Sequence, residues 1–158
     1  MPNKFHLAYF LTDSHAQAWG QPWSGNIGRD WWKPDLYVAV ARELERARFD
    51  YVLIEDNVFV ADTYAGSMEI YLRNALSVPR RDPLMTASYM LQATQHIGVV
   101  PTISTFAYHP YQAARMLSTL DQLSNGRLGW NVVTGSSNRA LQNFGHDGME
   151  KHDKRYDV

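Results

Sequence analysis

Four short apolar segments, separated by segments of helical character, constrain the fold of this chain more than any other feature. They are residues 5–11, 51–55, 97–104 and 127–134. Polar residues follow each of them, and the stretches between them repeat their apolar residues at helical spacing. This alternation predicts a parallel sheet whose strands are joined by right-handed helical crossovers.

The clearest unit of this kind runs from Gln122 to Thr134 and reads QLSNGRLGWNVVT. Asn125-Gly126 is typical of the left-handed turn that ends a helix. The residues from Arg127 to Thr134 predict a buried strand, because they form an apolar run rich in Val and Trp. Gly135 to Asn138 then supply a polar loop, and folds built from such units carry their functional groups in these loops.

Three of the intervening helices have a proline in the first turn, at Pro34, Pro83 and Pro110. Proline is favoured there because the first N–H groups of a helix have no partner within it. Shorter helices are expected at 68–75 and 138–144, and a further helix is expected to begin at Glu150. The predicted inward faces are Tyr37, Val40, Ala41, Leu44 and Ala47; Leu84, Ala87, Ser88, Leu91 and Thr94; and Ala114, Leu117, Leu120 and Leu123.

Two segments depart from this simple alternation. Residues 12–34 lack periodicity and contain four of the five tryptophans. A loop of this length is uncommon in a compact domain and is usually functional; its tryptophans could cap the core or line a pocket. Pro101 lies within the third predicted strand, where it argues against an ordinary central strand and predicts a bulge or bend near the strand end.

Composition and missing motifs exclude several classes of function. The net charge of −1 over 158 residues gives no electrostatic case for nucleic acid or an anionic membrane. The apolar run at 5–11 is too short for a signal peptide or a membrane span. The lack of cysteine excludes disulfides, thiolate catalysis and zinc–cysteine sites, and is compatible with a reducing cytoplasm. The chain has no GxGxxG, P-loop, HExxH or GxSxG motif.

The polar residues after the strands predict a site, because all carboxyl ends of a parallel sheet lie on one side. They are Thr12 and Asp13, then Asp56, then Thr102 and Ser104, then Thr134 to Ser137. Each position alone is weak evidence, since a polar residue there can simply begin a loop. The coincidence at four strands is what favours a site.

The last residues offer a candidate anion site. His152 and Tyr156 are four residues apart, hence on one face of a helix, and Arg155 lies beside them. The alternative is a surface helix with ion pairs to its own charged residues, and the residues alone favour that alternative. His146 and His152 match no common metal-ligand spacing, so no metal is expected.

Two architectures fit four βα units. One is a small doubly wound sheet. The other is the first half of an eightfold barrel, which typically needs about 250 residues. The helix expected at the end of the chain favours the second.

Several motifs resemble one family in combination. They are ARELERARFDYVLIED, RRDPLM, HPYQAARMLSTLD, STLDQLSNGRLGWNVVT, NFG and HDKRYD. Together they are similar to flavin-dependent monooxygenases of the bacterial luciferase-like superfamily. The closer match is to the branch that contains nitrilotriacetate monooxygenase component A, dibenzothiophene-sulfone monooxygenase and long-chain alkane monooxygenase.

The resemblance implies a (β/α)8 TIM barrel, of which residues 1–158 would form the N-terminal half with about four βα units. The loop at 12–34 would lie over the active-site face. The family's members are longer than this chain, so the alternative is a truncated or inactive half-barrel that binds flavin or another ligand without oxygenase activity.

The resemblance also implies the chemistry. Members use reduced FMN, which a separate NAD(P)H-dependent flavin reductase supplies, and O2 adds to it to give a C4a-hydroperoxide that oxygenates a small organic substrate. The expected enzyme is a cytoplasmic flavoprotein that is a homo-oligomer in its full-length form, with no nucleic-acid or membrane partner.

Motif matching places the implied cofactor contacts at Asp56, Thr102, Asn131, Thr134, Ser136, His152 and Tyr156. His152 and Tyr156 would lie near the FMN phosphate, so the resemblance favours the anion site over the surface helix. His15, Trp19 and Tyr64 are expected to face the substrate. The catalytic residues and the substrate itself are not predicted.

Overall fold

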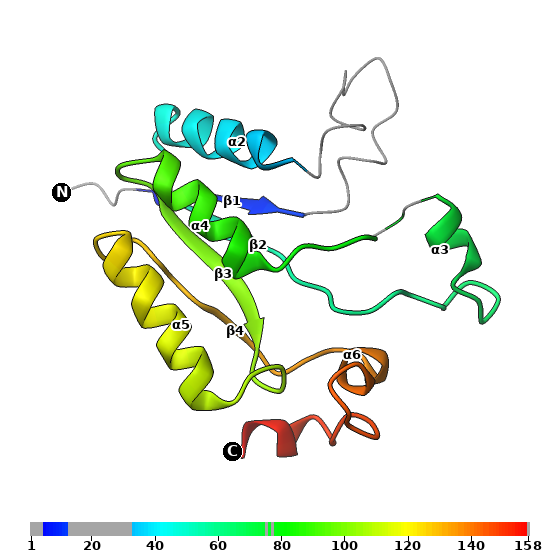
Figure 1. The fold of residues 1–158 in the computed structure, drawn as a ribbon. Helices are drawn as coiled ribbons and strands as arrows, with labels where there is room; N and C mark the ends of the chain where they lie inside the picture. The colour runs from blue at the N-terminus through cyan, green and yellow to red at the C-terminus, as the bar shows by residue number, and fades with distance from the viewer. Residues whose placement is uncertain (1–4, 13–32, 75, 77, 158) are drawn as a thin grey trace.

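The computed structural model describes residues 5–12, 33–74, 76 and 78–157. They form parallel strands joined by helices, in the predicted order (Figure 1). The elements are β1 (Ala8–Leu11), α2 (Pro34–Arg46), β2 (Tyr51–Ile54), α3 (Glu69–Arg73), α4 (Pro83–Ala93), β3 (Gly98–Ser104), α5 (Pro110–Leu123), β4 (Asn131–Val133), α6 (Asn138–Gln142) and the 3-10 turn η2 (Asp153–Tyr156).

The four strands form one parallel sheet in the order β1-β2-β3-β4. Tyr51 of β2 pairs with Ala8 on one side and with Gly98 on the other, and Thr102 of β3 pairs with Asn131 of β4. The strands therefore end on a common side, where Figure 1 shows α3 and α6. The segment between β2 and α4 extends away from the sheet there.

The core lies between the sheet and helices α2 and α4. Alternate residues of the central strands, Val52, Ile54 and Val99, point to these helices and are fully or almost fully buried. The remaining buried members of this cluster are Tyr37, Ala41, Ala87, Met90, Leu91 and Ile97. Since side chains alternate along a strand, the other residues of β2 and β3 face the opposite side of the sheet.

Pro101 lies in the central strand β3, where it is buried and interrupts the hydrogen bonding to β4. Val99 and Thr105 donate backbone hydrogen bonds toward β4, to the carbonyls of Arg127 and Val133 at 3.0 and 2.9 Å. Pro101 lies between these two positions on the same edge and has no N–H to donate. The pairing is interrupted there: an isolated bridge joins Val99 to Leu128, and β4 begins only at Asn131.

Several predictions about burial and extent are wrong. β4 is an edge strand of three residues and not a buried run over 127–134, and its Val132 is 55% exposed. On α5 the buried residue is Ala113 and not Ala114, and Leu123 is 77% exposed. The helix expected from Glu150 is the short 3-10 turn η2.

Glu45 of α2 anchors the connection from α4 to β3. Its Oε2 accepts hydrogen bonds from the backbone N–H groups of Gln95, His96 and Ile97 at 2.9, 2.7 and 3.0 Å. Burial acts to raise the pKa of Glu45, but these hydrogen bonds outweigh it and hold the pKa below its ordinary value. Its stabilising contribution is therefore present above the ordinary pKa and is lost as pH falls through the lowered one.

We expect Glu45→Gln to lower the free energy of unfolding at pH 7 by roughly 1–2 kcal/mol, because three donors then share a weaker neutral acceptor. Urea unfolding measures the change. Glu43→Gln on the same helix is the matched control, since its ion pair with Arg46 is exposed and contributes little to stability. Equal losses in the two variants would contradict the anchoring role.

Candidate cofactor site

A cavity of about 660 Å³ lies at the carboxyl ends of the strands. Its sheet residues include Thr102, Ser104, Asn131 and Val133, which belong to the face opposite α2 and α4. Six of the seven predicted cofactor residues line it. They are Asp56, Thr102, Asn131, Thr134, Ser136 and Tyr156.

Thr102 and Asn131 form the floor of this cofactor cavity as a cross-strand pair. They are register partners on β3 and β4, and the Asn131 amide donates to the Thr102 hydroxyl oxygen at 2.8 Å. The bond leaves the Thr102 O–H free to donate and the Asn131 carbonyl free to accept. A planar ligand with alternating donors and acceptors along one edge fits such a pair.

Asp56 follows β2 and lies at the cavity wall. Burial raises the pKa of Asp56 to about 6; the charges of Asp82 and Glu55 add to the rise, while a backbone N–H at Asn57 and the charge of Arg80 oppose it. Asp56 is therefore a carboxylate that changes charge just below neutral pH, at the edge of the site.

The raised pKa of Asp56 makes a pH-dependent prediction. Between pH 3.8 and about 6 the folded chain binds more protons at Asp56 than the unfolded chain does. The free energy of unfolding is therefore highest below the ordinary pKa of Asp56, and it falls as pH rises through the pKa that Asp56 has in the folded chain. We expect Asp56→Asn to remove this fall, which amounts to roughly 1–2 kcal/mol once solvent screening is included. Urea midpoints measured from pH 4 to 8 test it, and an unchanged pH slope in Asp56→Asn would contradict it.

The loop after β4 closes the cavity near Gly135. Gly135 has φ +89°, and a Cβ there would lie 2.7 Å from the ring of Phe106, which also lines the cavity. Arg155 donates from Nη1 to the carbonyl of Gly135 and to the sulfur of Met149. These contacts hold η2 against the loop and bring Tyr156 to the cavity.

Of the predicted anion site, Tyr156 lies at the cavity but His152 does not. The rings of His152 and Tyr156 are neighbours, with centroids 5.3 Å apart, but His152 does not line the cavity and its Nδ1 contacts Asp153 at 2.9 Å. Arg155 points to Gly135 rather than outward. Its Nε is buried and has no hydrogen-bond partner among the described residues.

Tyr64 is the only predicted substrate residue among the described residues, and it does not line this cavity. Tyr64 is exposed and lines a separate depression with Ser67 and Arg73. His15 and Trp19, with most of the loop at 12–34, lie outside the described residues.

Sequence reasoning missed a second cavity of about 670 Å³ beside the first. The two share the wall formed by residues 56–59. Tyr108 lines the second cavity and donates to Asp82 at 2.9 Å; burial and this bond raise the pKa of Tyr108 to about 12. Its residues come mostly from 56–83, a segment with little periodicity, so the sequence carried no signal for it.

Comparison with known proteins identifies the family. Residues 11–158 match the model of the luciferase-like monooxygenases. The chain belongs to this family. The long-chain alkane monooxygenase of Geobacillus thermodenitrificans is 40% identical over 124 residues, which cover 78% of this chain and 28% of that protein. The dibenzothiophene-sulfone monooxygenase of Rhodococcus erythropolis strain XP is 35% identical over 163 residues, covering 98% and 34%.

A solved structure connects this family fold to flavin. The structure of riboflavin lyase with modified FMN and riboflavin superposes with a TM-score of 0.86 at 34% identity, covering 98% of this chain and 35% of that one. The predicted family and α/β barrel class are thus confirmed, and the two curated relatives are named as monooxygenases. This luciferase-like chain spans about a third of their length.

The described residues contain neither a membrane-spanning helix nor a cluster of metal ligands. No helix there is long and apolar enough to cross a membrane. Nor do those residues bring three His, Cys, Asp or Glu side chains together as metal ligands.

Proposed function

We propose that this chain supplies the first four βα units of an FMN-dependent monooxygenase barrel, which takes reduced FMN from a separate flavin reductase in the cytoplasm and oxygenates a small organic substrate. The observation that carries the proposal is the cofactor cavity, where residues from four distant parts of the sequence meet at the carboxyl edge of a parallel sheet. This edge is where barrel enzymes carry their sites.

The residues present fit FMN. A volume of about 660 Å³ is in the range of cofactor sites. Thr102 and Asn131 offer a donor and an acceptor for a flavin ring edge. Within the proposal, Thr134, Ser136 and Tyr156 add hydroxyl groups, with His152 beside Tyr156.

Bound reduced flavin would supply the electrons that activate O2. The chain's own groups would bind and orient it: the Thr102–Asn131 pair by hydrogen bonds, and the Gly135 loop with Phe106 by covering the cavity and excluding water. Asp56 can hold or release a proton at the cavity wall near neutral pH.

Titration of the chain with FMN, followed by quenching of flavin fluorescence, tests cofactor binding. We expect Asn131→Ala and Tyr156→Ala each to raise the dissociation constant at least tenfold. Tyr111→Ala, which removes an exposed tyrosine from α5 away from the cavity, is the matched control and should stay within twofold. Unchanged affinity in both cavity variants would overturn the assignment of the cavity to FMN.

Turnover tests the monooxygenase step separately. With FMN, NADH and an added flavin reductase, product formation should require O2 and should exceed that of the reductase alone. FMN binding without O2-dependent product, across the substrates of the relatives named above, would instead support a flavin-binding half-barrel without oxygenase activity.

A further inference from the structure

The second cavity has mostly apolar walls. It lies between the segment that follows β2, the segment that precedes α4, and the end of α6. Most of its wall is apolar, contributed by Val58, Phe59, Val60, Leu72, Val78 and Phe144. Its volume of about 670 Å³ is ample for a small organic molecule.

The positive charges at this cavity are already engaged by the protein. Arg80 forms an ion pair with Glu55 at 3.3 Å, and its side chain is only 9% exposed. The guanidinium of Arg81 lies over the ring of Tyr37 at 4.6 Å from the centroid. Both arginines therefore already hold contacts within the protein, which disfavours their use by an anionic ligand.

Asp82, Tyr108 and Asn143 of the wall are also engaged in hydrogen bonds within the protein. Asp82 caps α4, where Oδ1 accepts from the N–H groups of Leu84 and Met85, and its Oδ2 accepts from Tyr108. The Asn143 amide donates to the carbonyl of Val58 at 2.6 Å. The carboxylates of Asp56 and Asp82 add negative charge, which disfavours an anionic ligand further.

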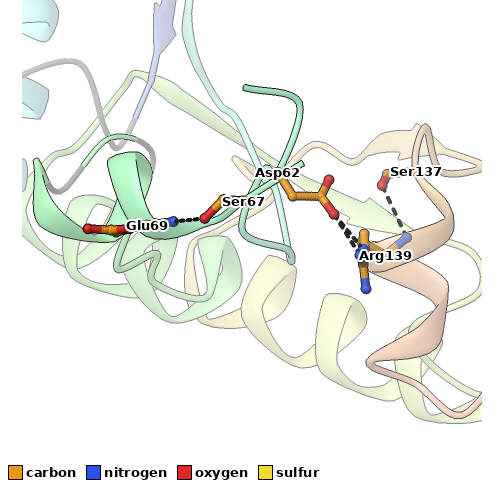
Figure 2. A network of polar contacts seen from close by, with 5 residues as sticks. All are labelled: Asp62, Ser67, Glu69, Ser137 and Arg139. Carbon is orange, nitrogen blue, oxygen red and sulfur yellow. Dashed lines mark hydrogen bonds and ion pairs between the residues drawn. The ribbon is translucent and has the colours of Figure 1, made fainter. Parts of the chain in front are cut away.

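The cavity wall is held in place before any ligand arrives. Figure 2 shows the guanidinium of Arg139, on α6, directed at the Asp62 carboxylate. Nε and Nη2 of Arg139 donate to Asp62 Oδ2 at 3.1 and 2.6 Å. Ser137 caps α6 by accepting a hydrogen bond from the Arg139 N–H. The Asp62–Arg139 ion pair therefore connects the segment after β2 to the capped first turn of α6.

The second cavity borders the cofactor cavity at two places. Residues 56–59 line both of them. The rings of Phe106, in the cofactor cavity, and Phe144, in the second, meet edge to face with centroids 5.4 Å apart. A molecule in the second cavity would therefore be adjacent to a flavin in the first.

We propose that the second cavity takes the organic substrate of the flavin reaction and that this substrate is an uncharged, predominantly apolar molecule. The inference rests on the proposed monooxygenase function. It separates substrates such as alkanes and aromatic sulfur compounds from polycarboxylates, which would need unpaired cations that this wall does not offer.

Isothermal titration of the full chain with two probes tests the substrate class. Dibenzothiophene sulfone is an uncharged aromatic probe, and nitrilotriacetate is a polycarboxylate probe. We expect the chain to bind the sulfone at least tenfold more tightly than nitrilotriacetate. Leu72→Asp places a charge at the cavity wall, at a position 58% exposed and so tolerant of the change, and should weaken sulfone binding at least tenfold.

Leu123→Asp is the matched control, because Leu123 is an exposed leucine on α5 that lines neither cavity. It should leave sulfone binding within twofold. Tighter binding of nitrilotriacetate, absence of sulfone binding, or equal losses in Leu72→Asp and Leu123→Asp would each overturn the inference. FMN titration of the same samples separates the two proposals, since FMN binding without sulfone binding contradicts the substrate assignment alone.

Discussion

Replacing Arg127 with methionine is expected to lower the free energy of unfolding by about 3 kcal/mol. The guanidinium donates four hydrogen bonds, to acceptors in α4, at the C-cap of α4, just before β3 and at the C-cap of α5. They are the carbonyls of Leu91, Ile97 and Ser124 at 2.7, 3.1 and 2.9 Å and the hydroxyl of Thr94 at 3.0 Å. Methionine fills much of the same space but leaves these partly buried acceptors without their donor.

Chemical unfolding of a matched set tests this role of Arg127. Arg127→Lys should lose most of the same stability, because a single ammonium cannot reproduce the planar fork of donors. Arg46→Met is the control, since the exposed Arg46–Glu43 pair contributes little to stability. A loss at Arg127 no larger than that at Arg46 would contradict the role of Arg127 in joining α4, β3 and α5.

Gly135→Ala is expected to lower stability by about 2–4 kcal/mol and to weaken FMN binding at least tenfold. Two costs combine: the φ of +89° is unfavourable for alanine, and the new Cβ would lie 2.7 Å from the Phe106 ring. Relief of that overlap moves either the loop or the ring, and both line the cofactor cavity.

Gly126→Ala separates the two costs. Gly126 also has a positive φ, +74°, but a Cβ there would meet nothing within 4 Å. It should therefore lose only the backbone component, roughly 1–2 kcal/mol, and should leave FMN binding unchanged. Thermal unfolding and FMN titration of both variants provide the comparison. Equal effects of the two substitutions on FMN binding would show that Gly135 has no special part in the cavity.

The order of elements could be predicted because its signals are local. Pro34, Pro83 and Pro110 each begin a helix as expected, and Asn125 and Gly126 both adopt the positive φ that ends α5. Once the strands are parallel, their carboxyl ends must converge. This is why Asp56, Thr102 and Thr134, distant in sequence, could be assigned to one site.

What could not be predicted depends on contacts between distant residues. Leu123 and Val132 belong to the apolar patterns of a helix and a strand, which predict burial, but both side chains are exposed in the described chain. The sequence around Arg127 does not indicate which four groups accept its hydrogen bonds, because three of them lie about 30 or more residues away in the chain. Nothing in the sequence indicates the close approach of Phe106 to Gly135, and although Arg155 is expected beside His152 and Tyr156, its hydrogen bond to the Gly135 carbonyl is not.

The most direct test of the central claim is to locate FMN on the chain by amide chemical-shift changes in the 15N-labelled protein. The claim predicts that the largest changes fall at Thr102, Asn131, residues 134–136 and Tyr156, which line the cofactor cavity. Amides of Tyr89 and Leu123, which line neither cavity, should stay unchanged. Changes at saturating FMN that avoid the carboxyl edge of the sheet would contradict the claim.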